Sequence, residues 1–353
     1  MGTSSSSPNG VTSQLALESV GGAVPVDSQF YIVRSTDREF HEAIARHESA
    51  ILVKGSRQMG KTSLLARGLQ KARESGATVI FTDIQKLNAK DLTVADTFFF
   101  TLADLVAEQL DLPVLPRDVW KCGDRSNANF ERYLKNEVLR SIPNRLVWGF
   151  DELDRLFAVD YGREVFALFR AWHNERALDP RSPWGSLTLL MSYSTEASLF
   201  IGDLNHSPFN IGTRLTLEDF DLNQVAELNR LYGSPLRNDQ ELGSFHRFVG
   251  GHPFLVRRGL HELVSRPLTY DLFEKEVDSE DGIFGDHLRR IPLLLAEDPG
   301  FREIVRGVLN DQICPTFESF ERLRSAGLVV GTSENDVRPR CELYSRFLRR
   351  QLA

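Results

Sequence analysis

The sequence predicts an α/β domain with a doubly wound parallel sheet, followed by a helical domain and a winged-helix domain. Up to about residue 222, short apolar runs rich in β-branched residues alternate with helical patterns, as in a parallel sheet with helices on both faces. From about Asn223 only helical spacing continues, and the residues after about 300 change to two helices, a β-hairpin and a final helix. Residues 1–25 hold Ser, Gly, Pro and Asn with few large apolar groups, which predicts a disordered tail. The expected segments are therefore a tail at 1–25, the α/β domain at 26–222, the helical domain at 223–297 and the winged helix at 298–353.

Each predicted element rests on a local pattern of apolar residues. Short apolar runs bounded by turn residues predict strands, and apolar residues three and four apart predict helices. The expected strands lie at 50–54, 77–82, 145–150, 187–193, 328–330 and 337–344. The expected helices lie at 36–45, 62–73, 94–110, 127–142, 225–232, 239–249, 253–265, 270–276, 301–310 and 316–326, with a further helix at the C-terminus.

Composition and charge exclude several classes of protein. Hydrophobic residues make up 41% and charged residues 26%, close to the averages for globular domains. The net charge of −7 argues against a protein whose main task is to coat a polyanion. Three cysteines without a C-x-x-C spacing give neither a disulfide framework nor a zinc site, so we expect a reducing cytoplasm. No apolar run approaches the roughly 18 residues that span a bilayer, so we expect no membrane partner.

A glycine-rich loop carries the strongest signal of chemistry. Residues Gly55 to Thr62 satisfy the pattern G-x-x-x-x-G-K-[ST] between a predicted strand and a predicted helix. Loop amides and the helix N-terminus can cradle a phosphate, and Gly60 allows the close backbone approach. Lys61 reaches the β- and γ-phosphates, and the Thr62 hydroxyl can bind Mg²⁺. The sequence therefore predicts ATP with Mg²⁺ in a P-loop whose nucleotide-binding residues are Gly55, Arg57, Gln58, Met59, Gly60, Lys61, Thr62 and Ser63.

Two acids follow the strand predicted at 145–150. Asp151 would hold Mg²⁺ through water, and Glu152 can polarise the water that attacks the γ-phosphate. Glu152 and Lys61 are thus the predicted catalytic residues. A solvated strand end or a helix cap is the alternative for Glu152 and Asp154.

The order of strands bears on the type of P-loop protein. In P-loop proteins with a catalytic Glu, an inserted strand separates the Asp strand from the P-loop strand, whereas kinase-type and GTPase-type proteins place the two side by side. We expect the first arrangement. The polar end of the strand at 187–193, residues 192–195, lies where a γ-phosphate sensor would sit, although Ser194 or Thr195 could equally cap the next helix.

These motifs together resemble a known family. The sequence is similar to the STAND class of AAA-like ATPases, and within it to the bacterial AAA-like domain found beside signalling and defence modules. The resemblance covers nearly all of the chain after residue 25. It rests on six segments in order, at 25–34 (PVDSQFYIVR), 57–63 (RQMGKTS), 150–157 (FDELDRLF), 207–212 (SPFNIG), 250–253 (GGHP) and 340–344 (RCELY).

The resemblance implies further nucleotide contacts. It implies a nucleotide clamped between the P-loop domain and the winged helix, with Val33 and Arg34 near adenine and Pro253 near the base or ribose. An interhelical turn is the alternative for the segment that holds Pro253, with Gly ending one helix and Pro opening the next. Arg214 would sense the γ-phosphate in cis or in trans, and a surface ion pair at a strand end is its alternative.

The leading functional hypothesis is a nucleotide-controlled signalling switch. ATP would change how the winged helix docks on the P-loop domain and thereby control a homo-oligomer or an effector protein supplied in trans. The resemblance implies slow hydrolysis and a part in bacterial defence or stress signalling. A scaffold that holds nucleotide permanently is a further alternative, against which an intact Glu152 speaks.

A DNA-associated ATPase is the rival hypothesis from another class. It would read DNA through the winged helix, where Arg338, Arg340, Arg346, Arg349 and Arg350 gather. Residues 301–353 hold nine Arg against seven Asp and Glu, a small surplus for a polyanion-binding surface. DNA is therefore the less favoured partner.

Overall fold

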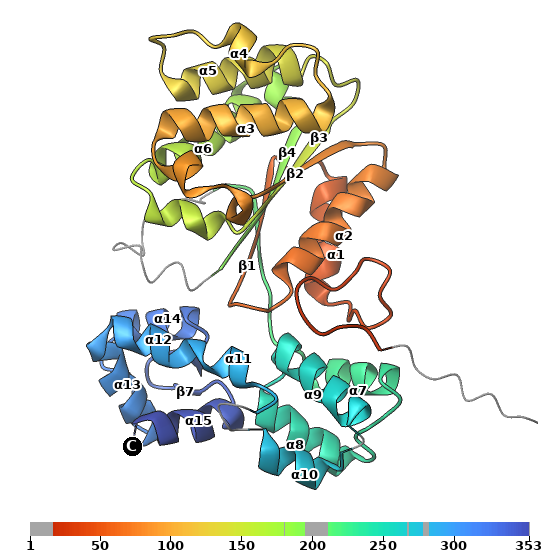
Figure 1. Cartoon of the computed structure of the whole chain (residues 1–353), viewed down its shortest axis with the longest axis vertical. Helices are drawn as coiled ribbons and strands as arrows, with labels where there is room; N and C mark the ends of the chain where they lie inside the picture. Colours follow the sequence, from red (N-terminus) through yellow and green to blue (C-terminus); the bar gives the residue numbers. More distant parts are fainter. Residues whose placement is uncertain (1–16, 180, 195–210, 267, 278–281, 353) are drawn as a thin grey trace, which may run out of the picture.

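The computed structural model describes residues 17–179, 181–194, 211–266, 268–277 and 282–352 (Figure 1). Five parallel strands form one sheet in the order β2-β3-β4-β1-β5. Their bounds are β1 Ala50–Gly55, β2 Thr78–Asp83, β3 Leu146–Asp151, β4 Leu187–Ser194 and β5 Thr213–Thr216. The predicted α/β parallel sheet is confirmed, and β5 adds an edge strand beside β1.

Helices cover both faces of this sheet. On one face, α1 (Ser35–Ala45) and α2 (Lys61–Glu74) pack Phe40, Leu65 and Leu69 onto β1, β3 and β4. On the other face lie three helices and their buried aromatic side chains. They are α3 (Ala95–Leu110), α5 (Ser126–Tyr133) and α6 (Gly162–Leu178). The helix predicted at 127–142 continues from α5 as a π-helix, Leu134–Val138, and α6 was not among the predicted helices.

Short helical turns join the larger elements. They are η1 Ile84–Lys86, η2 Ala89–Leu92, α4 Pro116–Val119, η4 Leu153–Ala158 and η5 Pro183–Ser186. No helix in the described ranges is both long and apolar enough to pass through a bilayer.

The C-terminal half is helical and contains one short hairpin. Its elements are α7 Leu222–Leu231, α8 Asp239–Val249, α9 Pro253–Ser265, α10 Tyr270–Glu276, α11 Gly285–Leu288, α12 Arg290–Glu297, α13 Pro299–Leu309, α14 Phe317–Ser325, β6 Val329–Val330, β7 Arg338–Pro339 and α15 Glu342–Leu352. One hydrophobic cluster runs from Phe220 to Leu352 and also takes in Phe30 and Ile32. The predicted helical and winged-helix units therefore share a core, and the boundary at 297/298 and the winged-helix assignment stay predictions.

The strand predicted at 337–344 is wrong beyond Pro339. The hairpin pairs Val329 with Pro339 and then ends, because α15 begins at Glu342. Its residues Leu343, Tyr344 and Phe347 are buried at helical spacing, so the apolar residues near 343 belong to a helix face.

The disordered tail predicted at 1–25 is wrong for residues 17–25, which the structure places against α2 and α9. Residues 1–16 lie outside the described part of the chain. The Val24 amide donates to Ser63 Oγ at 2.9 Å, and Arg67 donates to the carbonyls of Val24 and Pro25. This order comes from backbone groups bound to distant side chains, which the composition of the segment does not indicate.

Candidate nucleotide-binding site

A cavity of about 640 Å³ opens at the carboxyl ends of the strands. Ligands of parallel α/β sheets bind at this edge, and the volume suits a nucleotide-sized molecule. The cavity is bounded by the P-loop and the ends of β2, β3 and β4 on one side and by α7 and α9 on the other. The lining residues of the loop and strand ends are Arg57, Gln58, Met59, Gly60, Lys61, Thr62, Ser63, Asp83, Gln85, Asp151, Glu152, Asp154, Arg155, Ala158 and Ser194.

The P-loop has the backbone that phosphate binding needs. Gln58 and Gly60 have left-handed φ angles of 61° and 92°, which curl the loop ahead of α2. The buried Lys61 ammonium donates to the carbonyls of Gly55 at 3.2 Å and Ser56 at 3.1 Å. Gly55 is not among the residues that line the cavity, and an added Cβ there would stand 3.2 Å from Leu217 Cβ. Residues Arg57 to Ser63, Lys61 included, therefore all line one cavity.

Asp151 and Glu152 stand beside this loop. Asp151 is 3% exposed at the end of β3, and Ser192 Oγ and the Glu152 amide both donate to its Oδ1. Glu152 has a left-handed φ of 54°, an uncommon conformation for a residue with a side chain. Burial, then the carboxylates of Asp154, Asp151 and Asp83, raise the pKa of Glu152, while Lys61 lowers it.

Thr62 and Asp151 are the residues that would hold Mg²⁺. No group of three or more His, Cys, Asp or Glu in the described ranges is arranged to bind a metal by itself. Mg²⁺ is ordinarily held by one or two protein groups together with substrate phosphates and water. A hydroxyl and a buried carboxylate beside a phosphate-binding loop fit that requirement.

The strand order separates the two halves of the site. Strand β4 lies between β1 and β3, while β2 takes the sheet edge beyond β3. Asp83 at the end of β2 pairs in register with Asp151 and lines the cavity with Gln85. The sequence analysis missed both, although they follow a predicted strand whose carboxyl end must reach the same edge. Membership in the catalytic-glutamate type of P-loop protein stays a prediction.

Asp154 joins the end of β3 to the end of β4. Its Oδ1 accepts from the Ser194 amide at 3.0 Å, and both residues line the cavity. Of the predicted sensor segment 192–195, Thr195 lies outside the described residues. The γ-phosphate-sensing role of Ser194 is a prediction that this geometry leaves open.

Of the two residues predicted near adenine, Arg34 lines the cavity and Val33 does not. Arg34 is 7% exposed, lines the cavity, and donates from Nη1 to the Met59 carbonyl at 3.0 Å. Val33 is 68% exposed and does not line the cavity, whereas the buried Ile32 does. Successive side chains of an extended segment point to opposite sides, so contact by Ile32 and Arg34 turns Val33 away.

Pro253 lines the cavity, and Arg214 does not. Pro253 is the first residue of α9 and follows Gly250 and Gly251, whose φ angles of 65° and 70° make the interhelical turn. Pro253 therefore both follows the interhelical turn and lines the cavity, so the two alternatives do not exclude each other. Arg214 lies in β5 opposite Leu52, exposed on the sheet edge and beside Tyr193.

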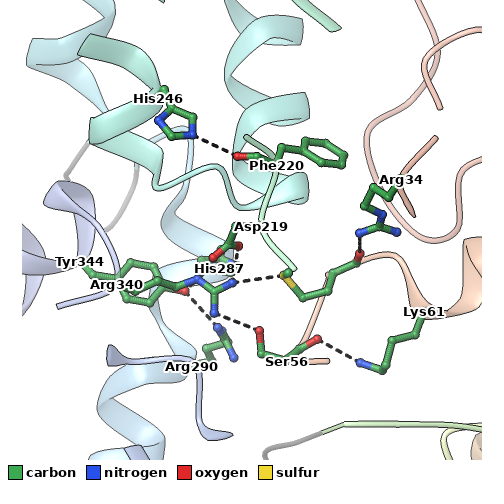
Figure 2. Close-up of polar contacts among 11 residues, drawn as sticks. Arg34, Ser56, Lys61, Asp219, Phe220, His246, His287, Arg290, Arg340 and Tyr344 are labelled. Atoms are coloured by element: carbon green, nitrogen blue, oxygen red, sulfur yellow. Dashed lines mark hydrogen bonds and ion pairs between the residues drawn. The ribbon is translucent and has the colours of Figure 1, made fainter. Parts of the chain in front are cut away.

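The C-terminal half contacts the far side of the P-loop, which sequence reasoning missed (Figure 2). The Arg340 guanidinium, 7% exposed, donates to Ser56 Oγ at 3.1 Å and Met59 Sδ at 3.2 Å, and forms an ion pair with Asp219. An added Cβ at Gly327 would stand 3.0 Å from Ser56 Cβ, so the backbone of this unit also approaches the loop closely.

A second contact runs through His287. Its Nδ1 lies 2.6 Å from Gln58 Oε1. Its Nε2 lies 2.6 Å from the Tyr344 hydroxyl, which also accepts from Arg290 (Figure 2). Burial, then Arg290, Arg340 and Arg57, hold the pKa of His287 well below its ordinary value. The ring is therefore neutral, and we assign its proton to Nδ1, which donates to the Gln58 amide oxygen.

Comparisons with known proteins agree with this architecture. A family model described as an AAA-like domain matches residues 19–350. A WD repeat-containing protein of Synechocystis is 26% identical over 260 residues, which cover 70% of this chain and 21% of that protein. The chain thus spans about a fifth of the curated relative that it matches.

Two solved structures share the fold. A Walker-type ATPase of Pyrococcus abyssi has a TM-score of 0.62 and 16% identity over 90% of this chain and 96% of that chain. The ORC2 protein of Aeropyrum pernix, solved in ADPNP and ADP complexes, has a TM-score of 0.50 and 16% identity over 93% and 98%. These likenesses support a P-loop ATPase fold.

The first prediction concerns nucleotide binding at this site. Mg²⁺ and ATP should raise the free energy of unfolding of the wild type by about 2.7 kcal/mol when ATP is at 100 times its Kd, because ATP binds the folded P-loop and not the unfolded chain. Thermal unfolding of the wild type, Lys61→Met and Lys71→Met with and without Mg²⁺-ATP measures this. Lys71 is the control because it lies exposed on the same helix, paired with Glu74. An equal rise in Tm for Lys61→Met would remove Lys61 from the site.

Proposed function

The chain belongs to the AAA-like domain family, and we propose that it is an ATP-binding, slowly hydrolysing conformational switch. The P-loop, Asp151 and Glu152 would hold and hydrolyse ATP. The state of the nucleotide would set how the C-terminal half docks on the P-loop. The cavity beside the P-loop and the two contacts that the C-terminal half makes with the loop, through Arg340 and His287, support this proposal.

The observation that carries the proposal is the placement of Arg340. One buried guanidinium contacts Ser56 and Met59 of the P-loop and Asp219 of the segment between β5 and α7. A buried charge is stable only while its partners stay in place. A movement of the loop when phosphates bind or leave would therefore disturb the contacts by which Arg340 holds the C-terminal half on the P-loop.

The acidic end of the cavity supports hydrolysis. Glu152 would accept the proton of the attacking water, and its raised pKa brings it nearer to the working range of a general base. Lys61 would stabilise charge on the β- and γ-phosphates. Thr62 and Asp151 would hold Mg²⁺, which neutralises phosphate charge when bound. The products are ADP and inorganic phosphate, with the proton carried away by Glu152.

The output of the switch would be assembly or control of a partner. We propose a homo-oligomer or an effector protein supplied in trans, as in bacterial signalling of the STAND class. The relationship to a much longer WD repeat-containing protein supports a module that works beside other domains. The exposed position of Arg214 on edge strand β5 suits a contact with a neighbouring copy.

Replacing Glu152 tests this function directly. Glu152→Gln should slow ATP turnover about 10²–10⁴-fold, because it removes the general base, while ATP binding is kept. Phosphate release and molar mass by light scattering would be measured for the wild type, Lys61→Ala, Glu152→Gln and the exposed control Glu164→Gln. We expect Glu152→Gln to trap an ATP-bound assembly and Lys61→Ala to bind no ATP. Unchanged turnover and mass in Glu152→Gln would contradict the switch.

A DNA-associated ATPase is the second candidate. The fold likeness to the ORC2 protein favours it over the signalling role among the solved structures. The side chains of the terminal unit give it less support. At least six of the nine arginines in 301–353 bind partners within the chain, namely Arg306, Arg322, Arg324, Arg340, Arg346 and Arg349.

Salt dependence separates the two candidates. Labelled duplex DNA would be titrated with protein at 50 and 200 mM salt, with ATP present, by fluorescence anisotropy. A DNA-associated ATPase making six to ten phosphate contacts should lose about 10³–10⁵ in affinity between these salts. Arg338→Met, on the exposed hairpin, should weaken binding, and the ion-paired control Arg324→Met should not. If the protein binds no DNA at 50 mM salt, the DNA-associated ATPase is ruled out and the signalling switch is the remaining candidate.

A further inference from the structure

Residues 17–27, here called the strap, form a wall of the nucleotide cavity that the sequence did not predict. Five strap residues, 20–24, line the cavity opposite the acidic strand ends. In Figure 1 the described start of the chain, in dark red, lies between the helices α1 and α2 and the helices α7 and α9. The inference drawn from it rests on the proposed nucleotide site and concerns how that site keeps its ligand.

The first anchor of the strap is on α2, the helix that starts at the P-loop. Ser63 Oγ accepts from the Val24 amide at 2.9 Å. Arg67 donates to the carbonyl of Val24 at 3.0 Å, and its other terminal nitrogen donates to the carbonyl of Pro25 at 2.6 Å. The guanidinium also lies 3.4 Å from the centre of the Tyr31 ring, which fixes its plane. A planar fork that binds adjacent carbonyls holds the backbone in one orientation.

The second anchor is on α9, across the cavity. Glu18 pairs with Arg257 at 2.7 Å, with exposed side-chain fractions of 29% and 8%. Ser28 Oγ donates to the same carboxylate oxygen at 2.6 Å, which closes the ends of the strap onto each other. Because the pair is largely withdrawn from water, it is screened less by salt than a surface pair.

Between the anchors the strap is loosely packed. Gly22 has a φ of 65°, and an added Cβ at Gly21 or Gly22 would have no heavy atom within 4 Å. The segment can therefore bend at this point without breaking packed contacts. The strap is held at its ends by side chains and is free to hinge between them.

We propose that Arg67 and Glu18 are positioning residues that hold the strap across the cavity and set how fast bound nucleotide leaves. Neither residue is among those that line the cavity, so neither is placed to touch the ligand. Their influence on nucleotide release would pass through the strap and through their own partners at the cavity wall, Arg257 for Glu18 and Ser63 for Arg67. The strap joins the P-loop helix to α9, so release of the ligand is coupled to the docking of the two halves.

Dissociation of a fluorescent ADP from the full chain tests this proposal. Arg67→Met and Glu18→Gln should each raise the dissociation rate by at least about tenfold, because each removes a charged hydrogen-bonding partner of the strap. Arg67→Lys keeps the charge without the fork and should raise it less. Lys71→Met and Glu74→Gln are matched controls from an exposed ion pair on α2 and should release ADP at the wild-type rate. The Tm without nucleotide shows that each variant is folded.

The outcomes separate this proposal from the proposed function. Folded Arg67→Met and Glu18→Gln variants that release ADP at the wild-type rate would overturn the role of the strap alone. A wild type that binds no fluorescent ADP would overturn the nucleotide site and the strap together. Faster release from both variants, with the controls unchanged, supports the strap, because the two residues act from opposite sides of the cavity.

Discussion

The architecture depends on one ion pair, between the buried guanidinium of Arg340 and the partly exposed Asp219, placed against the P-loop. Moving a guanidinium out of water costs several kcal/mol, which a carboxylate and well-placed acceptors must offset. Arg340 meets that cost only where Asp219, Ser56 and Met59 converge. The pair thereby holds the segment that leads to α7 and the C-terminal hairpin against the P-loop, beside the cavity.

The surrounding polar network follows from the same constraint. His252 is completely buried, and burial, then Arg340, His287 and Arg290, hold its pKa well below the ordinary histidine value. As neutral rings, His252 and His287 can pack beside the guanidinium groups of Arg290 and Arg340, which would repel a protonated, positively charged imidazole. The Gln58–His287–Tyr344 contacts then bind the P-loop to α11 and α15 by neutral hydrogen bonds. Both imidazole rings therefore stay neutral near neutral pH.

Local patterns predicted most of the sheet and the phosphate-binding end of the site. The P-loop and the acids after β3 have fixed spacing, so Lys61, Thr62, Asp151 and Glu152 were found together as expected. The contacts of Arg340 with Ser56 and of His287 with Gln58 span 284 and 229 positions, and no local pattern encodes such pairings. The ordered residues 17–25 were missed for the same reason, since Arg67 and Arg257 supply their order from afar.

The central claim is that nucleotide state changes how the C-terminal half docks on the P-loop. Cys122 is exposed on the sheet domain, whereas Cys314 and Cys341 are buried. The exposed Glu318 lies in the C-terminal half, so Glu318→Cys provides a second labelling site. Spin labels at positions 122 and 318 would then report the distance between the two halves. Double electron–electron resonance would measure this distance with Mg²⁺-ADP bound and with ATP trapped by Glu152→Gln. We predict two different distance distributions. A single distribution in both states would contradict the account.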